Sequence, residues 1–327
     1  MKTDKRIIFF TTKDPFEASQ YKDLAGDTRV ELIAGLFRKN EKLYAHARRI
    51  SKKEHLKFKH KVFLFVYSLF FARLHEYAGK TDIMVFTNSS VQGISPLYYK
   101  LFFALHKKIK PVLVFIDVTS KPTGVNAKRI ADASAKTLCF SFDKGDAEKY
   151  GYQHTMCIYS KYDVAAAETE SDIYFIGYVM DKLPMLHQIG KKFSGNAVES
   201  SINILGVNLN LREEIEGIHY LSQYKLYDDV VVETNASNCI LEVVQQGQTG
   251  ATLRYYEAIC YNKKLLTTNV HVKELPFYNP NYMKVFQNVD EIDYDWIKSK
   301  TPIDYHYDGR FSPVNLITEI LEALKLD

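Results

Sequence analysis

The sequence lacks the short patterns that mark several large enzyme classes. Walker A, Gly-x-Gly-x-x-Gly, Gly-x-Ser-x-Gly and His-Glu-x-x-His motifs are all absent from its 327 residues. There are only four cysteines, and no two of them form a Cys-x-x-Cys pair. These absences argue against nucleoside triphosphatases, dinucleotide enzymes, serine hydrolases and thiolate-bound zinc. We expect the cysteines to be reduced, buried thiols.

The sequence also offers little that would carry it across or into a bilayer. The apolar run Val62–Ala72 is far shorter than the roughly 20 residues that a transmembrane helix needs. The opening residues MKTDKRIIFF have too few apolar positions for a secretory signal peptide. We therefore expect a cytoplasmic protein.

What the sequence does have is the composition of a folded α/β protein. With 46% hydrophobic and 13% aromatic residues, its 327 residues suffice for two domains, each with its own core. Short apolar runs alternate with segments of helix length. Strands are predicted at Ile7–Thr11, Ile83–Thr87, Val112–Asp117, Thr137–Phe142, Met156–Tyr159, Ile173–Gly177, Ile202–Gly206, Val230–Val232, Leu265–Thr268 and Lys284–Phe286. Such near-continuous apolarity is typical of parallel strands covered on both faces, which predicts doubly wound sheets.

A stretch of small and polar residues, Ala165–Asp172, predicts a linker between two domains. We assign residues 1–168 to a first Rossmann-like domain and residues 169–311 to a second. Residues 312–327 predict a terminal helix, because Ser312 can cap its start, Pro313 fits its first turn and its apolar residues share one face.

The block from Ser237 to Asn269 carries the strongest functional signal. An apolar run leads into a polar loop with two glycines, a helix with Arg254 and Glu257 follows, and a short strand ends at Asn269. A loop that leads into a helix presents free backbone N–H groups and the positive end of the helix dipole to an anion. The block therefore predicts binding of a phosphate-bearing ligand.

This block resembles the nucleotide-binding half of bacterial GT-B glycosyltransferases, the kind that build capsule, lipopolysaccharide or exopolysaccharide. The resemblance is carried by Gly247 and Gly250, Glu257-Ala258, Lys263-Lys264 before Leu265-Leu266-Thr267, and more weakly by Asp172–Tyr178 and Phe140–Tyr150. It covers residues 110 to 325 with gaps. It implies two Rossmann-like domains that face a cleft and a C-terminal helix that crosses back to the first domain. It also implies a nucleotide-diphosphate sugar as donor, with no metal and no cofactor.

The resemblance suggests which residues hold the donor. Amides and hydroxyls would come from Gln248, Thr249, Gly250 and Thr252, and Gly177 would lie in a turn that opens the second domain. Arg254 would pair with a phosphate and assist the departure of the leaving group, and Glu257 would bond the ribose. For Arg254 and Glu257 the alternative is a surface ion pair, and Lys264 would either face a phosphate or be solvated. The retaining signature has a glutamate where this chain has Thr249, so the stereochemistry stays open.

Acceptor-side residues are expected at strand ends of the first domain, because ligands of open α/β sheets bind beyond the carboxyl ends of the strands. Asp117 closes one predicted strand and is a candidate catalytic base. Asn88, Ser89 and Ser90 close another and are candidates for the acceptor side. The alternative for each is a turn or helix-capping role.

A strongly basic segment precedes the apolar run Val62–Ala72. Between Arg38 and Lys61 there are ten basic residues and two acidic ones. The combination fits a peripheral contact with an anionic membrane, here at the inner face of the plasma membrane. It also fits a buried core helix beside solvated lysines. Nucleic acid is disfavoured, because the aromatic residues cluster apart from the lysines.

Together these features predict a glycosyltransferase that moves a sugar from a nucleotide donor to a glycan acceptor, expected to be lipid-linked, in surface polysaccharide biosynthesis. Two alternatives remain open at this point. One is an epimerase of GT-B shape acting on a nucleotide sugar. The other is a non-catalytic GT-B-like subunit of a glycosylation complex.

Overall fold

The computed structural model describes residues 7–38, 40–164, 170–178, 181–244 and 249–326. The chain divides into two compact units, here named unit 1 (Met1–Ser160 with Arg310–Asp327) and unit 2 (Lys161–Gly309). The predicted domain boundary at residue 168 lies outside the described residues and stays a prediction.

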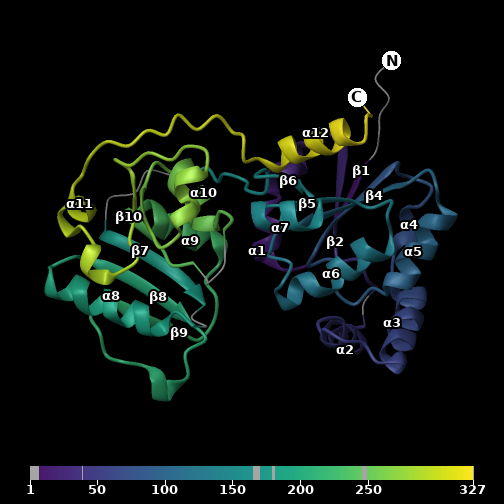
Figure 1. The fold of residues 1–327 in the computed structure, drawn as a ribbon, viewed down its shortest axis with the longest axis horizontal. Coiled ribbons are helices and arrows are strands. Elements are labelled where there is room, and N and C mark those ends of the chain that lie inside the picture. Colours follow the sequence, from purple (N-terminus) through teal and green to yellow (C-terminus); the bar gives the residue numbers. More distant parts are fainter. Residues whose placement is uncertain (1–6, 39, 165–169, 179–180, 245–248, 327) are drawn as a thin grey trace. The chain divides into compact units, whose positions relative to one another are not determined.

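Unit 1 is built on a parallel sheet with strand order β2-β1-β3-β4-β5-β6 (Figure 1). The strands are β1 Ile7–Thr11, β2 Val30–Ala34, β3 Ile83–Thr87, β4 Lys110–Phe115, β5 Leu138–Ser141 and β6 Gln153–His154. In register, Ile7 lies between Val30 of β2 and Ile83 of β3. Every residue of β1 and β3 is buried, which explains why these segments are apolar without alternation.

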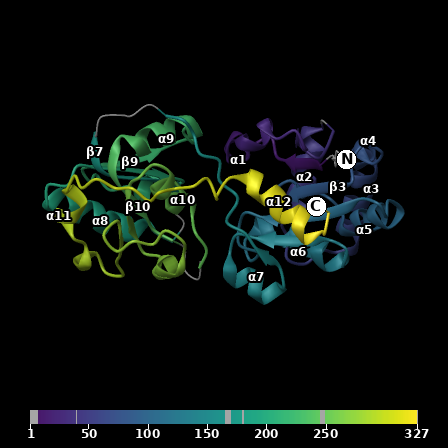
Figure 2. The same cartoon turned by 90° about the horizontal axis from the view of Figure 1, so that it is seen from above.

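Helices cover both faces of this sheet (Figure 2). They are α1 Pro15–Gln20, the 3-10 helix η1 Lys22–Gly26, α2 Glu41–Ser51, α3 Phe58–Phe71, α4 Leu74–Tyr77, α5 Pro96–Leu105, α6 Pro122–Ala133, α7 Lys144–Tyr150 and α12 Pro313–Ala323. Local sequence sets several starts, since α1, α5, α6 and α12 each have a proline in the first turn. Asp143 caps α7, since its side chain accepts a hydrogen bond from the Asp146 amide.

The core of unit 1 is rich in aromatic rings, which accounts for much of the phenylalanine and tyrosine in its sequence. Phe10 of β1 stacks on Phe86 of β3 with ring centroids 5.1 Å apart. Tyr99 of α5 meets Phe86 edge to face at 5.7 Å, and Phe103 meets it at 6.2 Å. Rings from adjacent strands and from the covering helix therefore form one continuous cluster.

The terminal helix α12 belongs to unit 1, as predicted. Its N-cap Ser312 accepts from the Val314 amide and donates its hydroxyl to Asp23 at 2.5 Å. Leu316, Ile317 and Ile320 are fully buried. The helix is thus held to the early part of the chain by both a polar contact and an apolar face.

Unit 2 has a second parallel sheet, with order β12-β11-β10-β7-β8-β9. Its strands are β7 Ser171–Tyr178, β8 Ser200–Leu205, β9 Ile218–Leu221, β10 Ser237–Glu242, β11 Lys264–Thr267 and β12 Met283–Val285. Its helices are α8 Leu183–Gly195, η2 Leu209–Leu211, α9 Tyr227–Asn235, α10 Leu253–Cys260, η3 Val270–Glu274, η4 Val289–Glu291 and α11 Tyr294–Lys298. Two doubly wound parallel sheets were predicted, and both are confirmed.

One predicted strand is wrong, because Val230–Val232 lies in helix α9. Three β-branched residues in a row favour a strand by propensity. The helix nevertheless buries Tyr227, Val230, Val231 and Thr234, which recur at helical spacing, and acidic residues occupy its first turn. Packing of that face against the sheet outweighs the intrinsic preference of the valines.

Other strand expectations also needed correction. Met156–Tyr159 is not a strand. The last strand of unit 1 is instead the two-residue β6 just before it, and the Tyr159 amide donates to the Phe311 carbonyl. Strands β2 and β9 were not predicted. Both carry partly exposed residues at the edge of a sheet, so their sequences lack the continuous apolarity of the central strands.

The apolar run Val62–Ala72 forms most of helix α3. The helix buries Leu64, Tyr67 and Ser68 but leaves Phe70 and other apolar side chains exposed. The expectation of a buried core helix therefore holds for one face only. Within the described residues, no helix has both the length and the apolarity to cross a bilayer.

Candidate functional site

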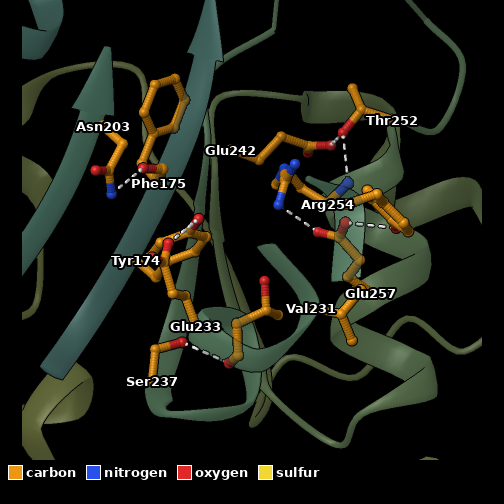
Figure 3. A network of polar contacts seen from close by, with 12 residues as sticks. Tyr174, Phe175, Asn203, Val231, Glu233, Ser237, Glu242, Thr252, Arg254 and Glu257 are labelled. Carbon is orange, nitrogen blue, oxygen red and sulfur yellow. Dashed lines mark hydrogen bonds and ion pairs between the residues drawn. The ribbon is translucent and has the colours of Figure 1, made fainter. Parts of the chain in front are cut away.

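The predicted anion-binding block lies at the carboxyl edge of the unit 2 sheet. Strand β10 ends at Glu242, β11 ends at Thr267, and α10 starts directly after Thr252 (Figure 3). Residues 245–248 of the connecting loop, Gln248 among them, lie outside the described residues. The block therefore has the strand–loop–helix order that the sequence predicts.

The start of α10 is fixed by a single threonine. Thr252 caps the helix, since its hydroxyl oxygen accepts from the Arg254 amide at 3.1 Å. The same hydroxyl donates to the carboxylate of Glu242. One side chain thus joins the end of β10 to the first turn of α10 and leaves the N-terminus of the helix at the edge of the sheet.

Arg254 and Glu257 form a buried ion pair within α10, not the surface pair that was the alternative prediction. Arg254 Nη1 lies 2.5 Å from Glu257 Oε2, and the two side chains are 13% and 0% exposed. The second carboxylate oxygen of Glu257 accepts from the Tyr227 hydroxyl at 2.9 Å. Burial raises the pKa of Glu257, against the lowering effects of Arg254 and Tyr227.

This geometry corrects the role predicted for Glu257. A carboxylate with no exposed surface and a partner on each oxygen is not presented to a ribose. Its contacts instead orient the guanidinium of Arg254, which carries the positive charge in the first turn of α10. In the structure Glu257 therefore fixes the position of the Arg254 side chain.

Glu242 is a further member of the site that the sequence analysis missed. Its two oxygens accept from the hydroxyls of Thr252 and Thr267, and it is 1% exposed. Burial raises its pKa, and the two threonine hydrogen bonds and the charges of Lys182 and Arg254 act in the opposite direction. Figure 3 shows the Arg254 side chain between Glu242 and Glu257. The sequence signal that could have identified Glu242 is a carboxylate that directly follows the apolar residues Cys239, Ile240 and Leu241.

The remaining described loop residues lie at the same edge of the sheet. Gly250 is buried, and its carbonyl oxygen accepts from Asn269 Nδ2 at 3.4 Å. Thr249 is half-buried beside it. Asn269 in turn caps η3 by accepting from the His271 amide at 3.0 Å. The loop and the strand end β11 are thereby tied together at the edge that α10 faces.

Lys264 does not belong to this site. It is the first residue of β11, which places it at the opposite edge of the sheet from Thr267. It is 1% exposed, and its ammonium group donates to the Trp296 carbonyl at 2.6 Å and to the Ser299 hydroxyl at 2.7 Å. Burial lowers the pKa of Lys264. Both predicted roles, facing a phosphate or facing solvent, are wrong.

Gly177 lies near the carboxyl edge of the unit 2 sheet, but in a strand and not in the predicted turn. It is part of strand β7, paired with Ile204, and not part of a turn. A Cβ atom there would lie 3.1 Å from the ring of Phe175. The residue is therefore small because of close packing in the strand.

The residues of unit 1 that were predicted for the acceptor-substrate side have different surroundings in the structure. Ser90 lines a cavity of about 160 Å³ at the carboxyl ends of β1 and β2. Asn88 is fully buried, and its Oδ1 accepts from the Ile116 amide at 3.0 Å, which links the ends of β3 and β4. Ser89 is half-buried in the turn that directly follows β3. The cavity is lined by Thr11, Thr12, Lys13, Gly35, Leu36, Phe37, Arg38, Asn40, Glu41, Tyr44 and Ser90.

Asp117 is bound into the start of α6. Its carboxylate accepts from Lys121 Nζ at 2.6 Å and from the Thr123 hydroxyl at 3.0 Å. It does not line the cavity beside Ser90. An ion-paired carboxylate at this place anchors a helix, so the geometry does not favour Asp117 as the base.

Unit 1 contains a buried carboxyl group that resembles Glu242 in its setting. Glu17 of α1 is 4% exposed and accepts from the hydroxyls of Thr12 at 2.6 Å and Thr87 at 2.5 Å. Burial raises its pKa. Thr12 follows β1 and Thr87 ends β3, so Glu17 joins two strand ends at the carboxyl edge. Thr12 also lines the cavity.

Comparison with known proteins identifies the fold. No family model and no curated protein matches the chain. An α-glucosyltransferase solved with UDP and a 13-mer DNA containing a HMU base is similar over 97% of this chain and 98% of that one, with a TM-score of 0.59 and 12% identity. Another α-glucosyltransferase structure, with UDP and a 13-mer DNA containing a central A:G mismatch, covers 98% and 99% with a TM-score of 0.52 and 12% identity. The chain therefore has the GT-B glycosyltransferase fold that the resemblance implied.

Proposed function

We propose that the protein is a glycosyltransferase that uses a nucleotide-diphosphate sugar as donor. The observation that carries the proposal is Arg254, held in the first turn of α10 by the buried Glu257 at the carboxyl edge of unit 2. A fixed guanidinium beside the N-terminus of a helix suits a diphosphate. The two α-glucosyltransferase structures of the same fold are complexes with UDP, which makes UDP the first donor nucleotide to try.

Arg254 would act on the chemistry through charge. Departure of the nucleotide diphosphate develops negative charge on the leaving oxygen, and a preorganised cation stabilises that charge. The N–H groups of the first turn of α10 would assist. No metal is needed in this scheme, and the stereochemistry of transfer is left open.

For the acceptor we propose a glycan, lipid-linked and part of surface polysaccharide biosynthesis. The support is the resemblance of the donor block to enzymes of that type. The cavity beside Ser90 in unit 1 is the site offered for the acceptor hydroxyl. A base near that cavity would take the hydroxyl proton.

Donor binding is tested first with UDP, GDP, CDP and TDP by thermal unfolding of the whole chain. A nucleotide at about 100 times its Kd adds about 2.7 kcal/mol of stability. We expect one nucleotide to stabilise the wild type and to lose at least tenfold in affinity in Arg254→Met. Lys192→Met, which removes a surface cation of the same unit, is the matched control. Equal affinity in both variants would refute the donor site.

An assay of turnover distinguishes the glycosyltransferase from the two alternatives, the epimerase and the non-catalytic subunit. Release of free nucleotide diphosphate from a donor sugar in the presence of a lipid-linked glycan supports transfer. Interconversion of the donor sugar without nucleotide release would instead indicate the epimerase. Tight nucleotide binding with neither reaction, over a panel of donors and acceptors, would indicate the non-catalytic subunit.

A second candidate acceptor is DNA. Both α-glucosyltransferase structures compared above are complexes with a 13-mer DNA, and this chain carries ten basic residues between Arg38 and Lys61, which favours a DNA acceptor. The test offers a duplex with hydroxymethylated bases beside the lipid-linked glycan. Sugar transfer to the duplex alone would replace the polysaccharide proposal.

A further inference from the structure

Helix α3 exposes an apolar stripe along its outer side. Phe58, Val62, Val66 and Phe70 follow one another at intervals of four residues, and their exposed fractions are 82%, 46%, 45% and 66%. Residues four apart lie on the same face of a helix. The opposite face packs into the core through Leu64 and Tyr67, so the exposed stripe is not part of the core of unit 1.

Helix α5 carries a second stripe of the same kind. Leu97, Leu101 and Leu105 again stand four residues apart, and their exposed fractions are 55%, 45% and 78%. The buried face of α5 consists of aromatic rings, including Tyr99 and Phe102.

The two stripes belong to one surface. Both views place α3 and α5 side by side at one edge of unit 1 (Figures 1 and 2). A groove of about 500 Å³ is lined by Phe58 and Val62 from α3 and by Leu97 from α5. Monomeric soluble proteins rarely leave so many large apolar side chains exposed in one place. We name this surface the α3–α5 face.

The α3–α5 face is surrounded by positive charge. Lysines are exposed at the start of α3, on α5 and just after it, and neither helix contains an acidic residue. The exposed lysines are Lys57, Lys59, Lys61, Lys100, Lys107 and Lys108. An apolar surface with a cationic margin complements a lipid bilayer with anionic headgroups.

The charge pattern also decides between occupants. A second copy of the chain would bring the same lysines together, and like charges repel. A nucleic acid would contact the lysines but would leave the leucines and phenylalanines exposed to water. Of these three occupants, an anionic lipid surface is the one that complements both the apolar stripes and the lysines of the α3–α5 face.

We propose that unit 1 docks on an anionic lipid membrane through the α3–α5 face. The apolar stripes enter the boundary between headgroups and acyl chains, and the lysines lie among the lipid phosphates. This proposal does not depend on the proposed glycosyl transfer, because it concerns helices that do not line the donor site.

The test is flotation of the full chain with vesicles. One set contains roughly 30% phosphatidylglycerol in phosphatidylcholine, and the other contains phosphatidylcholine alone. We expect binding to the anionic vesicles that weakens as salt is raised. The double variant Phe58→Ser/Leu105→Ser should lower the partition coefficient at least tenfold. The matched control, Leu209→Ser/Leu226→Ser, changes two side chains of unit 2 that are 80% and 66% exposed and should leave binding unchanged.

Four results would overturn the proposal. The first is absence of flotation with anionic vesicles, and the second is an equal loss in the control variant. The third is a self-association, measured by sedimentation, that the Phe58→Ser/Leu105→Ser variant abolishes while vesicles do not bind. Binding to duplex DNA that this variant leaves intact, without vesicle binding, would assign the lysines to nucleic acid instead.

Discussion

Replacing Arg254 by methionine tests the buried ion pair that organises the donor site. The substitution keeps a long apolar stem but leaves Glu257, which has no exposed surface, without its cation. Two unit charges about 4 Å apart interact with about 4 kcal/mol at an effective dielectric constant of about 20. Removal of one partner of a buried pair costs about 3–5 kcal/mol. We therefore expect Arg254→Met to lower the unfolding free energy of unit 2 by about 3–5 kcal/mol at neutral pH.

The penalty should depend on pH in a defined direction. Burial already raises the pKa of Glu257 above 4.5, and loss of Arg254 removes a charge that lowers it. The folded variant then holds a proton that the unfolded chain releases, so its stability falls as pH rises from about 4.5 through the folded-state pKa. The slope for one proton is about 1.4 kcal/mol per pH unit. The difference between variant and wild type should shrink as pH is lowered from about 7 to about 5.

Trp296 makes the measurement specific to unit 2. It is the only tryptophan in the sequence, and it packs against the core of that unit. Urea unfolding followed by its fluorescence therefore reports on the unfolding of unit 2. Lys192→Met, which breaks a pair with side chains 46% and 66% exposed, should leave the stability of unit 2 nearly unchanged, because solvent screens an exposed ion pair. A similar small cost for Arg254→Met, or one independent of pH, would refute the reasoning.

Three further predictions concern other buried groups. Glu242→Gln should reduce the loss of unit 2 stability that occurs as pH rises above about 4.5, because burial raises the pKa of the carboxyl that the substitution removes. Unfolding followed by tryptophan fluorescence at several pH values checks this. Lys264→Met should cost about 1–3 kcal/mol in the same assay and leave nucleotide affinity unchanged, since it removes the donor to the Trp296 and Ser299 carbonyls. Gly124→Ala should destabilise unit 1 by about 1–3 kcal/mol in circular dichroism melts, because its Cβ would lie 2.6 Å from the Thr119 carbonyl oxygen, whereas Gly79→Ala has nothing within 4 Å and should be neutral.

The central strands and the terminal helix could be predicted from the sequence because their signals are local. Strands β1 and β3 are buried on both faces, so each reads as an unbroken apolar run with the bounds that the structure has. Helix α12 carries its own cap, its proline and its apolar face within twelve residues, Ser312–Ala323. Nothing elsewhere in the chain is needed to recognise either kind of element.

The missed features depend on partners far away in the sequence. Helix α9 forms from a run of valines because its buried face packs in the unit, and no local propensity reports that contact. Glu242 is buried because Thr252 and Thr267 reach it from two other elements. Glu257 matched the family pattern by position, yet its contact with Tyr227 from α9 turns it away from a ligand. Side-chain direction at a site is set by such contacts and could not be derived from spacing.

The placement of α12 has a consequence for the order in which the protein folds on the ribosome. Unit 2, residues 161–309, is complete in sequence before Arg310 is synthesised. Unit 1 completes its core later, because the apolar surface that Leu316, Ile317 and Ile320 cover stays exposed until the last helix has been synthesised. The half of the chain that is translated first is therefore the half that finishes folding last, and during that interval its early segments are the ones exposed to chaperones and to aggregation.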